Sequence, residues 1–386
     1  MATSRGFAHL LDAWLAEQCG AGNPSELPQA LRQAQLDALN AMLARARNNA
    51  TFYARHLARV PLPLASLEQL ASVPFIGADE VRNWGGLCCV SQSEVERMLT
   101  ARTSGTTGPP KRLAFSHADL ERTATFFRIG MRQLLAPGQR LAVLLPGGDK
   151  PFGVADLLAR ALTPAGDAYG VSLGGAECRA LPDTLAKQLM DASLPVSGGA
   201  SGPYLAECAA WLRDYAPHVL VTEPTQLRKL LTVFDRGAPP DVRAVLSSGD
   251  MLDDTLQARI RGIWGCRLVN HYGLSECGFG GAVECLHNDG KHIRALDLYV
   301  EIVDPVTGAP MPPETPGEIV ITTLRAEAMP LVRYRTGDAG SLIARPCACG
   351  SPLSRLGEIL GRLDRSGTEP RIVRPHKAGN SRSTAQ

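Results

Sequence analysis

Residues 103–112 read TSGTTGPPKR, a stretch in which four hydroxyl side chains and two glycines precede two prolines and two cations. Glycines let a backbone curl closely around an anion so that its N–H groups point inward, and hydroxyls can donate hydrogen bonds to phosphate oxygens. The pattern therefore predicts a phosphate-binding loop. The residues expected to contact phosphate are Thr103, Ser104, Gly105, Thr106, Thr107, Gly108 and Lys111.

Downstream of this loop, short apolar runs alternate with helical patterns. The runs are RLAVLLP (140–146), PHVLVTEP (217–224), VRAVLSSGD (242–250) and CRLVNHYG (266–273). Strands that alternate with helices form a largely parallel sheet whose two faces are covered. Ligands of such sheets bind at the carboxyl ends of the strands, so we expect the site there.

The pattern changes again between residues 296 and 343. Closely spaced apolar runs separated by Pro/Gly turns predict antiparallel strands at LDLYVEIVD (296–304), GEIVITTL (317–324), LVRYRTGD (331–338) and GSLIA (340–344). The predicted fold class is therefore α/β, with a largely parallel sheet, flanking helices and a smaller antiparallel β subdomain.

These patterns divide the chain into four parts. We expect an N-terminal extension at residues 1–29, an α/β domain at 30–295, and the antiparallel subdomain of that same domain at 296–364. The last 22 residues hold five Arg/Lys and one Glu with few apolar side chains. Such a composition cannot build a core, so residues 365–386 are expected to be a basic, disordered tail.

Composition narrows the class of partner. Forty basic and 38 acidic side chains leave a net charge of +2, which argues against nucleic acid or anionic lipid as the main partner. No apolar run approaches the roughly 18–20 residues of a membrane span, and the N-terminal stretch carries acidic residues where a signal peptide has an apolar core. We expect a cytoplasmic protein that acts on small molecules.

Four short motifs follow the predicted loop in the order SSGD (247–250), NHYGLSEC (270–277), YRTGD (334–338) and GRLD (361–364). Tyr272 offers a flat face to a nucleobase, and Glu276 offers a carboxylate to Mg²⁺. Asp338 can accept hydrogen bonds from ribose hydroxyls, as acidic residues do in dinucleotide sites. Taken alone, Tyr272 and Glu276 are more typical of an ordinary loop, and the YRTGD motif by itself is a weak signal.

Taken together, these motifs and the loop resemble the adenylate-forming superfamily of acyl-CoA ligases. The segments NNATFYARHL (48–57), LASLEQLASVPF (64–75) and ECLHNDGKHI (284–293) are similar to the phenylacetate-CoA ligase branch, and the likeness covers roughly residues 30–364. The resemblance implies that a carboxylate attacks the α-phosphate of ATP, giving an acyl-adenylate and pyrophosphate, and that CoA then displaces AMP. It also implies an aromatic or arylacetic acid as substrate.

The resemblance further implies residue roles. Glu276 would hold Mg²⁺ and, with Thr107 and Lys111, serve catalysis, while Tyr272 would stack on adenine and Asp338 would bind the ribose. The remaining nucleotide-site residues implied are Ser248, Gly249, Asp250, Gly273, Ser275 and Arg362, the last of these in a hinge motif with Asp364.

A set of cysteines and histidines predicts a structural zinc site. Cys285, His292, Cys347 and Cys349 supply three thiolates and one imidazole, a complete tetrahedral set with no open position. His287 is the alternative to His292, and the GKHI setting of His292 is more similar to the branch. The seven other cysteines of the chain are expected to be packing residues.

The chain departs from the superfamily after Asp364, where a second domain with a catalytic lysine normally follows and only 22 residues remain. Three interpretations stay open. The protein is a compact CoA ligase, slow or supplied with the lysine by a partner chain; an acyl-protein synthetase that uses a protein thiol; or a catalytically impaired protein that binds nucleotide and acid. A homodimer is compatible with all three.

Overall fold

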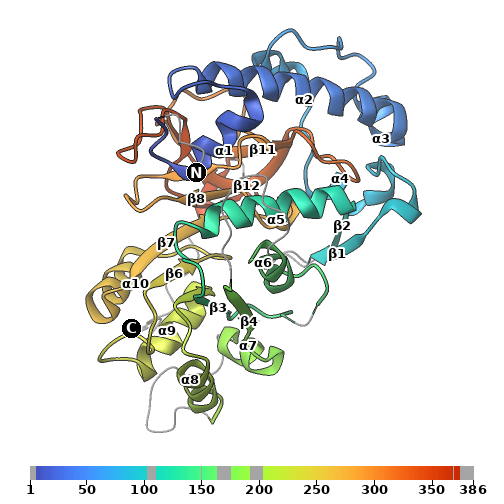
Figure 1. Ribbon diagram of the computed structural model, residues 1–386. Coiled ribbons are helices and arrows are strands. Elements are labelled where there is room, and N and C mark those ends of the chain that lie inside the picture. The colour runs from blue at the N-terminus through green and yellow to red at the C-terminus, as the bar shows by residue number, and fades with distance from the viewer. Residues whose placement is uncertain are drawn as a thin grey trace, which may run out of the picture.

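The computed structural model describes residues 6–101, 110–148, 150–162, 175–191, 203–367 and 369–373. Its helices lie on both sides of a central sheet and over a second sheet (Figure 1). The α-helices are α1 (Leu10–Cys19), α2 (Leu27–Asn49), α3 (Thr51–His56), α4 (Ala78–Arg82), α5 (His117–Met131), α6 (Val154–Leu162), α7 (Asp183–Met190), α8 (Pro203–Tyr215), α9 (Pro224–Val233) and α10 (Asp254–Arg259). Short helical turns lie at Leu67–Ser72, Trp84–Gly86, Gln92–Glu94, Ile260–Trp264 and Ser275–Cys277.

The largest sheet has nine strands in the order β13-β14-β9-β8-β7-β6-β5-β3-β4. The parallel part consists of β3 (Arg140–Val143), β4 (Glu177–Ala180), β5 (Val219–Thr222), β6 (Ala244–Ser247) and β7 (Arg267–Tyr272). The antiparallel part consists of β8 (Ala282–Glu284), β9 (Lys291–Ile293), β13 (Leu342–Ile343) and β14 (Arg355–Leu356). The predicted parallel sheet is confirmed, and four antiparallel strands extend it.

Alternation along the parallel strands explains why their sequences are continuously apolar. Leu141 and Val143 of β3 pack on one face with residues of α5 and α6, whereas Ala142 packs on the other face with residues of α7, α8 and α9. β5 repeats this alternation, because Val219 and Val221 join the first cluster and Leu220 joins the second. Successive strand side chains point to opposite faces, so a sheet covered on both faces needs apolar residues at every position.

The second sheet is antiparallel and has the order β10-β11-β12-β15-β16. Its first three strands are the predicted ones. The five strands are β10 (Leu298–Val303), β11 (Gly317–Thr323), β12 (Tyr334–Gly340), β15 (Gly361–Asp364) and β16 (Arg371–Val373). A separate two-stranded ladder joins β1 (Arg97–Ala101) and β2 (Lys111–Phe115).

Two expectations for this region differ from the structure. The run GSLIA (340–344) was expected in the antiparallel subdomain, but its β13 pairs with β14 in the larger sheet. In the segment expected to be a disordered tail, residues 371–373 form β16 against β15, and Arg365 forms an ion pair with the buried Glu318 at 2.6 Å. Backbone pairing needs no apolar side chain, so composition alone did not reveal β16.

The N-terminal residues are also more than an extension. Helix α2 begins at Leu27, two residues before the boundary placed at residue 29, and α1 packs with α2 in an apolar cluster that includes Val283 and Leu296. Figure 1 shows α1, α2 and α3 at the same end of the molecule as β11 and β12, with α7, α8 and α9 at the opposite end.

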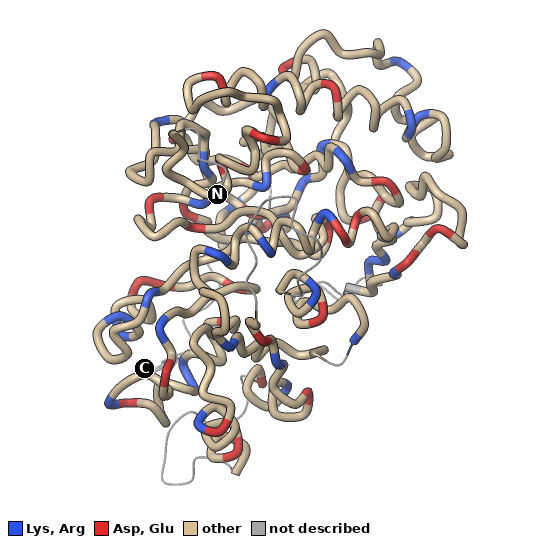
Figure 2. The backbone as a smooth tube through the Cα atoms, viewed as in Figure 1, with Lys and Arg blue, Asp and Glu red and all other residues tan. Residues whose placement is uncertain are grey.

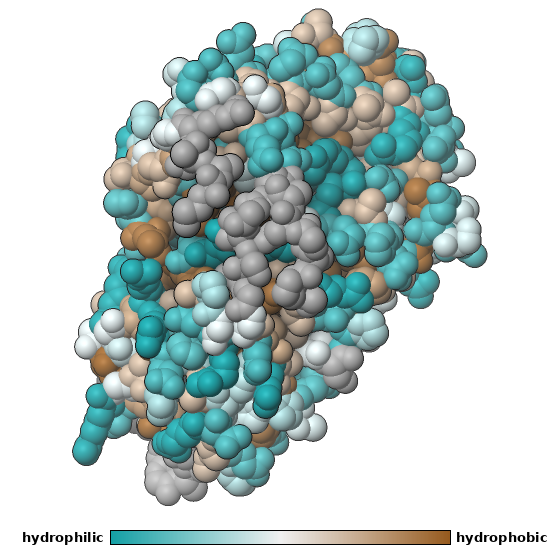
Figure 3. All heavy atoms as spheres, viewed as in Figure 1, coloured by the Kyte–Doolittle hydropathy of each residue, from teal (hydrophilic) through white to brown (hydrophobic). Residues whose placement is uncertain are grey.

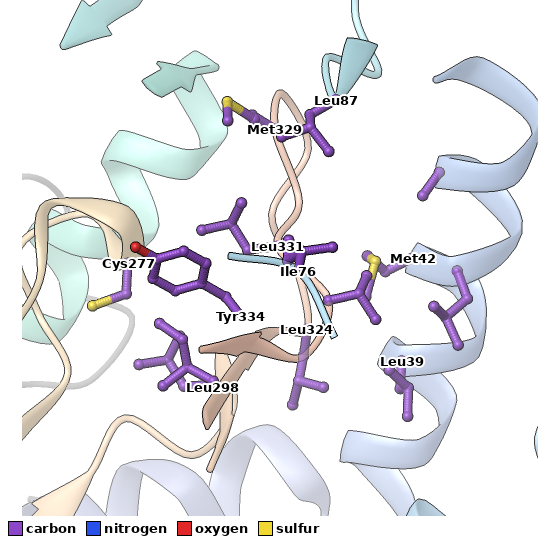
Figure 4. Close-up of a cluster of buried hydrophobic side chains, with 14 of the residues drawn as sticks. Leu39, Met42, Ile76, Leu87, Cys277, Leu298, Leu324, Met329, Leu331 and Tyr334 are labelled. Atoms are coloured by element: carbon purple, nitrogen blue, oxygen red, sulfur yellow. The ribbon is translucent and has the colours of Figure 1, made fainter. Parts of the chain in front are cut away.

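A large apolar core joins α2 and α3 to the antiparallel sheet. Figure 4 shows Leu39 and Met42 of α2 facing Leu324 and Leu331, with the ring of Tyr334 in the same cluster. The segment between β11 and β12 is therefore fixed from the helical side. This matters for the site because β12 begins at Tyr334.

The surface agrees with the sequence composition. Among the described residues Lys/Arg and Asp/Glu are interspersed over the molecule (Figure 2), and on the face shown in Figure 3 hydrophobic residues are scattered in small patches. Among the helices that the structure describes, none combines the length and apolar character needed to cross a bilayer.

We predict that Tyr53→Phe destabilises the fold by about 1–3 kcal/mol, because two buried backbone groups would lose their partner. Tyr53 of α3 is fully buried, donates a hydrogen bond to the carbonyl of Pro330 at 2.8 Å and accepts one from the N–H of Val332 at 3.3 Å. Urea unfolding measures the loss. Tyr299→Phe on β10 is the control, and an equal loss in both variants would contradict the role of the Tyr53 hydroxyl.

Candidate nucleotide site and metal cluster

Three polar side chains from distant segments meet in a buried cluster. Lys111 at the start of β2 donates to Glu276 Oε1 at 2.5 Å and to the hydroxyl of Tyr334 at 2.8 Å. The Tyr334 hydroxyl in turn donates to Glu276 Oε1 at 2.9 Å. The side chains of Lys111 and Glu276 are 6% and 8% exposed, so this ion pair is largely removed from water. The hydrogen bonds of the Tyr334 hydroxyl to both groups help to offset the cost of removing the charges from water. We call these three residues the lysine cluster.

A second cluster forms around Asp338 of β12. The Tyr272 hydroxyl donates to Asp338 Oδ2 at 2.9 Å, and Arg362 of β15 donates to Asp338 Oδ1 at 2.9 Å. The register of the sheet places Asp338 directly opposite Arg362. Burial raises the pKa of Asp338, and the Arg362 guanidinium opposes that rise. We call Tyr272, Asp338 and Arg362 the aspartate cluster.

Both clusters depend on the same two segments. Tyr272 and Glu276 flank the turn that leaves β7, and Tyr334 and Asp338 lie on β12. The turn itself requires glycine at position 273, because a Cβ there would lie 2.5 Å from the carbonyl oxygen of Phe279. Ser275 opens the helical turn that carries Glu276. Carboxylates, a cation and an aromatic ring thus converge beyond the end of a parallel strand, where ligands bind in such sheets.

The predicted phosphate loop lies outside the described residues, except for its end. Thr103, Ser104, Gly105, Thr106, Thr107 and Gly108 belong to the stretch 102–109, which the structure does not describe. Lys111 is described, and its ammonium forms an ion pair with Glu276.

A row of polar side chains follows the carboxyl ends of β5, β6 and β7. The register pairs Thr222 with Ser247 and Ser247 with Asn270, so that Glu223, Ser248 and His271 come next on the three strands. Ser248 Oγ and His271 Nδ1 are 2.9 Å apart.

Gly249 and Asp250 extend this row. Gly249 has a φ of +92°, and a Cβ at this position would lie 2.6 Å from Glu223 Oε1. Asp250 caps its own turn, since its Oδ1 accepts the N–H of Met251 at 2.7 Å. The SSGD motif therefore sits beside Glu223, whose pKa is raised to about 7 by burial and by the charge of Asp250.

Three residues near these clusters were not singled out from the sequence. Tyr334 lies inside the motif YRTGD, but nothing local indicates that its hydroxyl reaches Glu276. Glu223 and His271 lie at the ends of strands, and this position is the sequence feature that could have identified them. Burial lowers the pKa of His271 to about 4, and its Nε2 has no hydrogen-bond partner among the described residues.

The four residues expected to hold zinc come together. Ligand atoms of Cys285, His292, Cys347 and Cys349 all lie within 4.8 Å of one another, and His287, which is exposed, is not in this group. Cys285 Sγ and Cys347 Sγ are 3.6 Å apart, and Cys349 Sγ and His292 Nε2 are 3.5 Å apart. We call these residues the four-ligand cluster.

Those separations fit a tetrahedral metal rather than a disulfide. Zn–S bonds of about 2.3 Å and a Zn–N bond of about 2.0–2.1 Å place two sulfurs about 3.8 Å apart, and a sulfur and a nitrogen about 3.6 Å apart. A disulfide would need about 2.05 Å between sulfurs. Cys285 follows β8, His292 lies on β9, and both remaining cysteines precede β14, so the cluster belongs to the antiparallel half of the larger sheet.

Comparisons with known proteins find similar sequences and a similar fold. Residues 194–324 match the family model described as AMP-binding enzyme. A phenylacetate-coenzyme A ligase of Pseudomonas putida is 32% identical, with 87% of this chain and 71% of the relative covered. One of Thermus thermophilus is 30% identical, with 86% and 71% covered. A solved 2-hydroxyisobutyryl-CoA ligase in complex with its acyl-AMP and CoA has a TM-score of 0.68 at 23% identity and covers 86% of this chain and 68% of that chain, a likeness of fold.

We predict that Glu223 makes the stability of the protein fall as the pH rises. Because the pKa of Glu223 is about 7 in the folded state against 4.5 for the ordinary group, folding favours the protonated carboxyl. Its stabilising contribution is complete below about pH 4.5 and is lost as the pH passes 7. Urea unfolding at pH 5 and pH 8 should show a smaller decline in Glu223→Gln than in the wild type.

The control for this prediction is Glu207→Gln, which changes an exposed carboxylate on α8. It should decline with pH as the wild type does. If Glu223→Gln also follows the wild type, burial does not hold the Glu223 carboxyl in its protonated form.

Proposed function

The chain belongs to the phenylacetate-CoA ligase branch of the adenylate-forming enzymes, and we therefore propose that it activates a carboxylic acid with ATP and then transfers the acyl group to CoA. The observation that carries the proposal is the convergence of Lys111, Glu276, Tyr272 and Asp338 from three separate segments beyond the end of β7. The substrate proposed is an aromatic or arylacetic acid, because the relatives of Pseudomonas putida and Thermus thermophilus are named for phenylacetate.

The two-step chemistry follows from the poor reactivity of a carboxylate. Displacing an oxygen from it directly would require oxide as leaving group. Attack of the carboxylate oxygen on the α-phosphorus forms a C–O–P bond and releases pyrophosphate. The thiol sulfur then attacks the acyl carbon, and the C–O bond breaks with AMP as leaving group. Enzymes of this type mainly position charges around phosphate oxygens.

The lysine cluster is proposed to serve the phosphates. When ATP is bound, Mg²⁺ held by Glu276 would neutralise charge between phosphate oxygens. Lys111 would then exchange its contact with Glu276 for one with phosphate, while Tyr334 keeps a hydrogen bond to the Glu276 carboxylate. The Tyr334 hydroxyl thus holds the orientation of Glu276 in both arrangements.

The aspartate cluster is proposed to bind the nucleoside. Asp338 would accept the ribose hydroxyls, and the Tyr272 hydroxyl fixes the carboxylate while the Tyr272 ring lies against adenine. Ser248, Gly249 and Asp250 would border the base, where the absence of a side chain on Gly249 allows close approach. Arg362 holds Asp338 from the side of β15.

We also propose that the four-ligand cluster binds one structural Zn²⁺. Three thiolates and one imidazole fill a tetrahedral site, so no coordination position remains for substrate. When bound, the ion would supply a cross-link between the β8–β9 hairpin and the loop before β14. The hairpin follows directly from the turn that carries Glu276, which links the metal to the geometry of the nucleotide site.

The proposed function is tested by exchange of labelled pyrophosphate into ATP in the presence of a panel of aliphatic, benzoic and arylacetic acids. We expect exchange with the aryl acids, and thioester formation when CoA is added. Exchange without thioester, accompanied by acylation of a protein thiol, would favour an acyl-protein synthetase. Absence of exchange over the whole panel would contradict the proposed activity.

Replacing Glu276 by Gln should lower the rate of adenylation by about 10²–10³, because one charged contact to the phosphates and their metal is removed. The carboxamide has the same shape and keeps an acceptor oxygen for Lys111 and Tyr334, so the fold should persist in circular dichroism, although the unpaired charge of Lys111 lowers the stability. Glu121→Gln, an exposed change on α5, is the matched control. Equal exchange rates for Glu276→Gln and the control would remove Glu276 from the site.

Metal analysis of the purified protein should find one zinc per chain. Cys349→Ser should lose the metal and unfold at lower urea, because metal binding contributes folding free energy. Cys266→Ser, a change outside the cluster, should retain both. A chain that is equally stable with and without chelator would contradict the proposed cross-link.

A further inference from the structure

The N-terminal segment covers the four-ligand cluster directly. A Cβ built on Gly350, the residue after Cys349, would lie 3.0 Å from the Cβ of Ala8. The imidazole of His9 stacks on the ring of His292, with centroids 4.3 Å apart and an interplanar angle of 16°. The helix that follows, α1, therefore lies against the cluster, although it is remote from it in sequence.

Asp12, in the first turn of α1, has a carboxylate oxygen that lacks a hydrogen-bond donor. It is 2% exposed, and its Oδ1 has no hydrogen-bond partner among the described residues. The nearest cationic candidate is His9, whose Nδ1 lies 3.7 Å away, beyond hydrogen-bond distance. A carboxylate buried in this way is costly unless a donor reaches it.

His9 does not supply that donor. Its Nε2 lies 3.3 Å from Gln133 Oε1, an oxygen that can only accept, so the ring proton belongs on Nε2. In this tautomer Nδ1, which has no hydrogen-bond partner among the described residues, presents a lone pair to the Asp12 carboxylate. His9 can fill space over His292, but it leaves Asp12 unpaired.

His292 carries a ring proton that it can donate. Its Nε2 is the atom that faces the thiol of Cys349, so the lone pair that would bind a metal is on Nε2 and the ring proton is on Nδ1. Ligand atoms of His9, Asp12 and His292 lie within 4.8 Å of one another. A cavity of about 260 Å³ borders both Asp12 and His292, which leaves room for the carboxylate to turn or for a bridging water.

We propose that α1 is part of the metal centre: Asp12 accepts the Nδ1 proton of His292, directly or through one water, and thereby orients the imidazole toward the ion. His9 packs flat on a face of the same ring. Asp12 is a positioning residue, because it acts through His292 and not on the metal. This inference rests on the zinc site proposed above, and it adds a carboxylate that the sequence motif of four ligands did not include.

The test is zinc affinity, measured by competition with a chromophoric chelator on the full chain. Asp12→Ala should bind zinc about 10- to 100-fold more weakly than the wild type, as loss of outer-shell partners generally does. Asp12→Asn keeps an acceptor oxygen and should lose less. The matched control is Glu17→Ala, which removes an exposed carboxylate from the same helix and should leave the affinity unchanged.

Substitution with Co²⁺ gives a second readout that does not depend on activity. The absorption bands of the tetrahedral ion should shift in Asp12→Ala, because the imidazole is no longer held, and should stay in place in Glu17→Ala. Circular dichroism and pyrophosphate exchange verify that each variant is folded.

The outcomes separate this inference from the metal site on which it rests. Zinc affinity and cobalt spectra of Asp12→Ala and Asp12→Asn equal to those of the wild type would refute the role of Asp12 while leaving the four-ligand cluster in place. Two zinc ions in the wild type and one in Asp12→Ala would show direct coordination, which also overturns the proposal. A wild-type chain that binds no zinc refutes the cluster and the role together.

Discussion

The ion pair between Lys111 and Glu276 joins two segments of this protein that lie far apart in the sequence. Lys111 is the first residue of β2 in the small β1–β2 ladder, Glu276 follows the last parallel strand, and Tyr334 is the first residue of β12 in the antiparallel sheet. Two opposite charges removed from water are stable only while each has its partner. A substitution that removes one of them leaves the other charge buried and unpaired, which strongly destabilises the fold. The pair thus fixes the β1–β2 ladder and, through Tyr334, the antiparallel sheet relative to the turn that carries Glu276.

The rest of the molecule supports that turn from two sides. On one side, the apolar core beneath α2 and α3 fixes the start of β12 and with it Tyr334. On the other side, β8 and β9 continue from the turn into the four-ligand cluster, which α1 covers. Catalytic groups need positions fixed to fractions of an ångström, and here that precision would come from packing and a metal cross-link rather than from the site residues themselves.

The prediction of the parallel strands depended on periodicity, which is local information. β3, β5, β6 and β7 appear as continuous apolar runs because both of their faces are buried, and all four are confirmed. β16 was missed because its exposed side chains carry no such signal, and GSLIA was assigned to the wrong sheet because a run of apolar residues does not say which neighbour it pairs with.

The sequence by itself determined the fold class, the family resemblance and the residue types of the site, since motifs and apolar periods are properties of short segments. Only the tertiary structure decided that Lys111 contacts Glu276, that Tyr334 completes the lysine cluster, and that Asp12 lies beside His292. Residues separated by more than a hundred positions meet only after strands pair and helices pack, and no local pattern encodes which of them will do so.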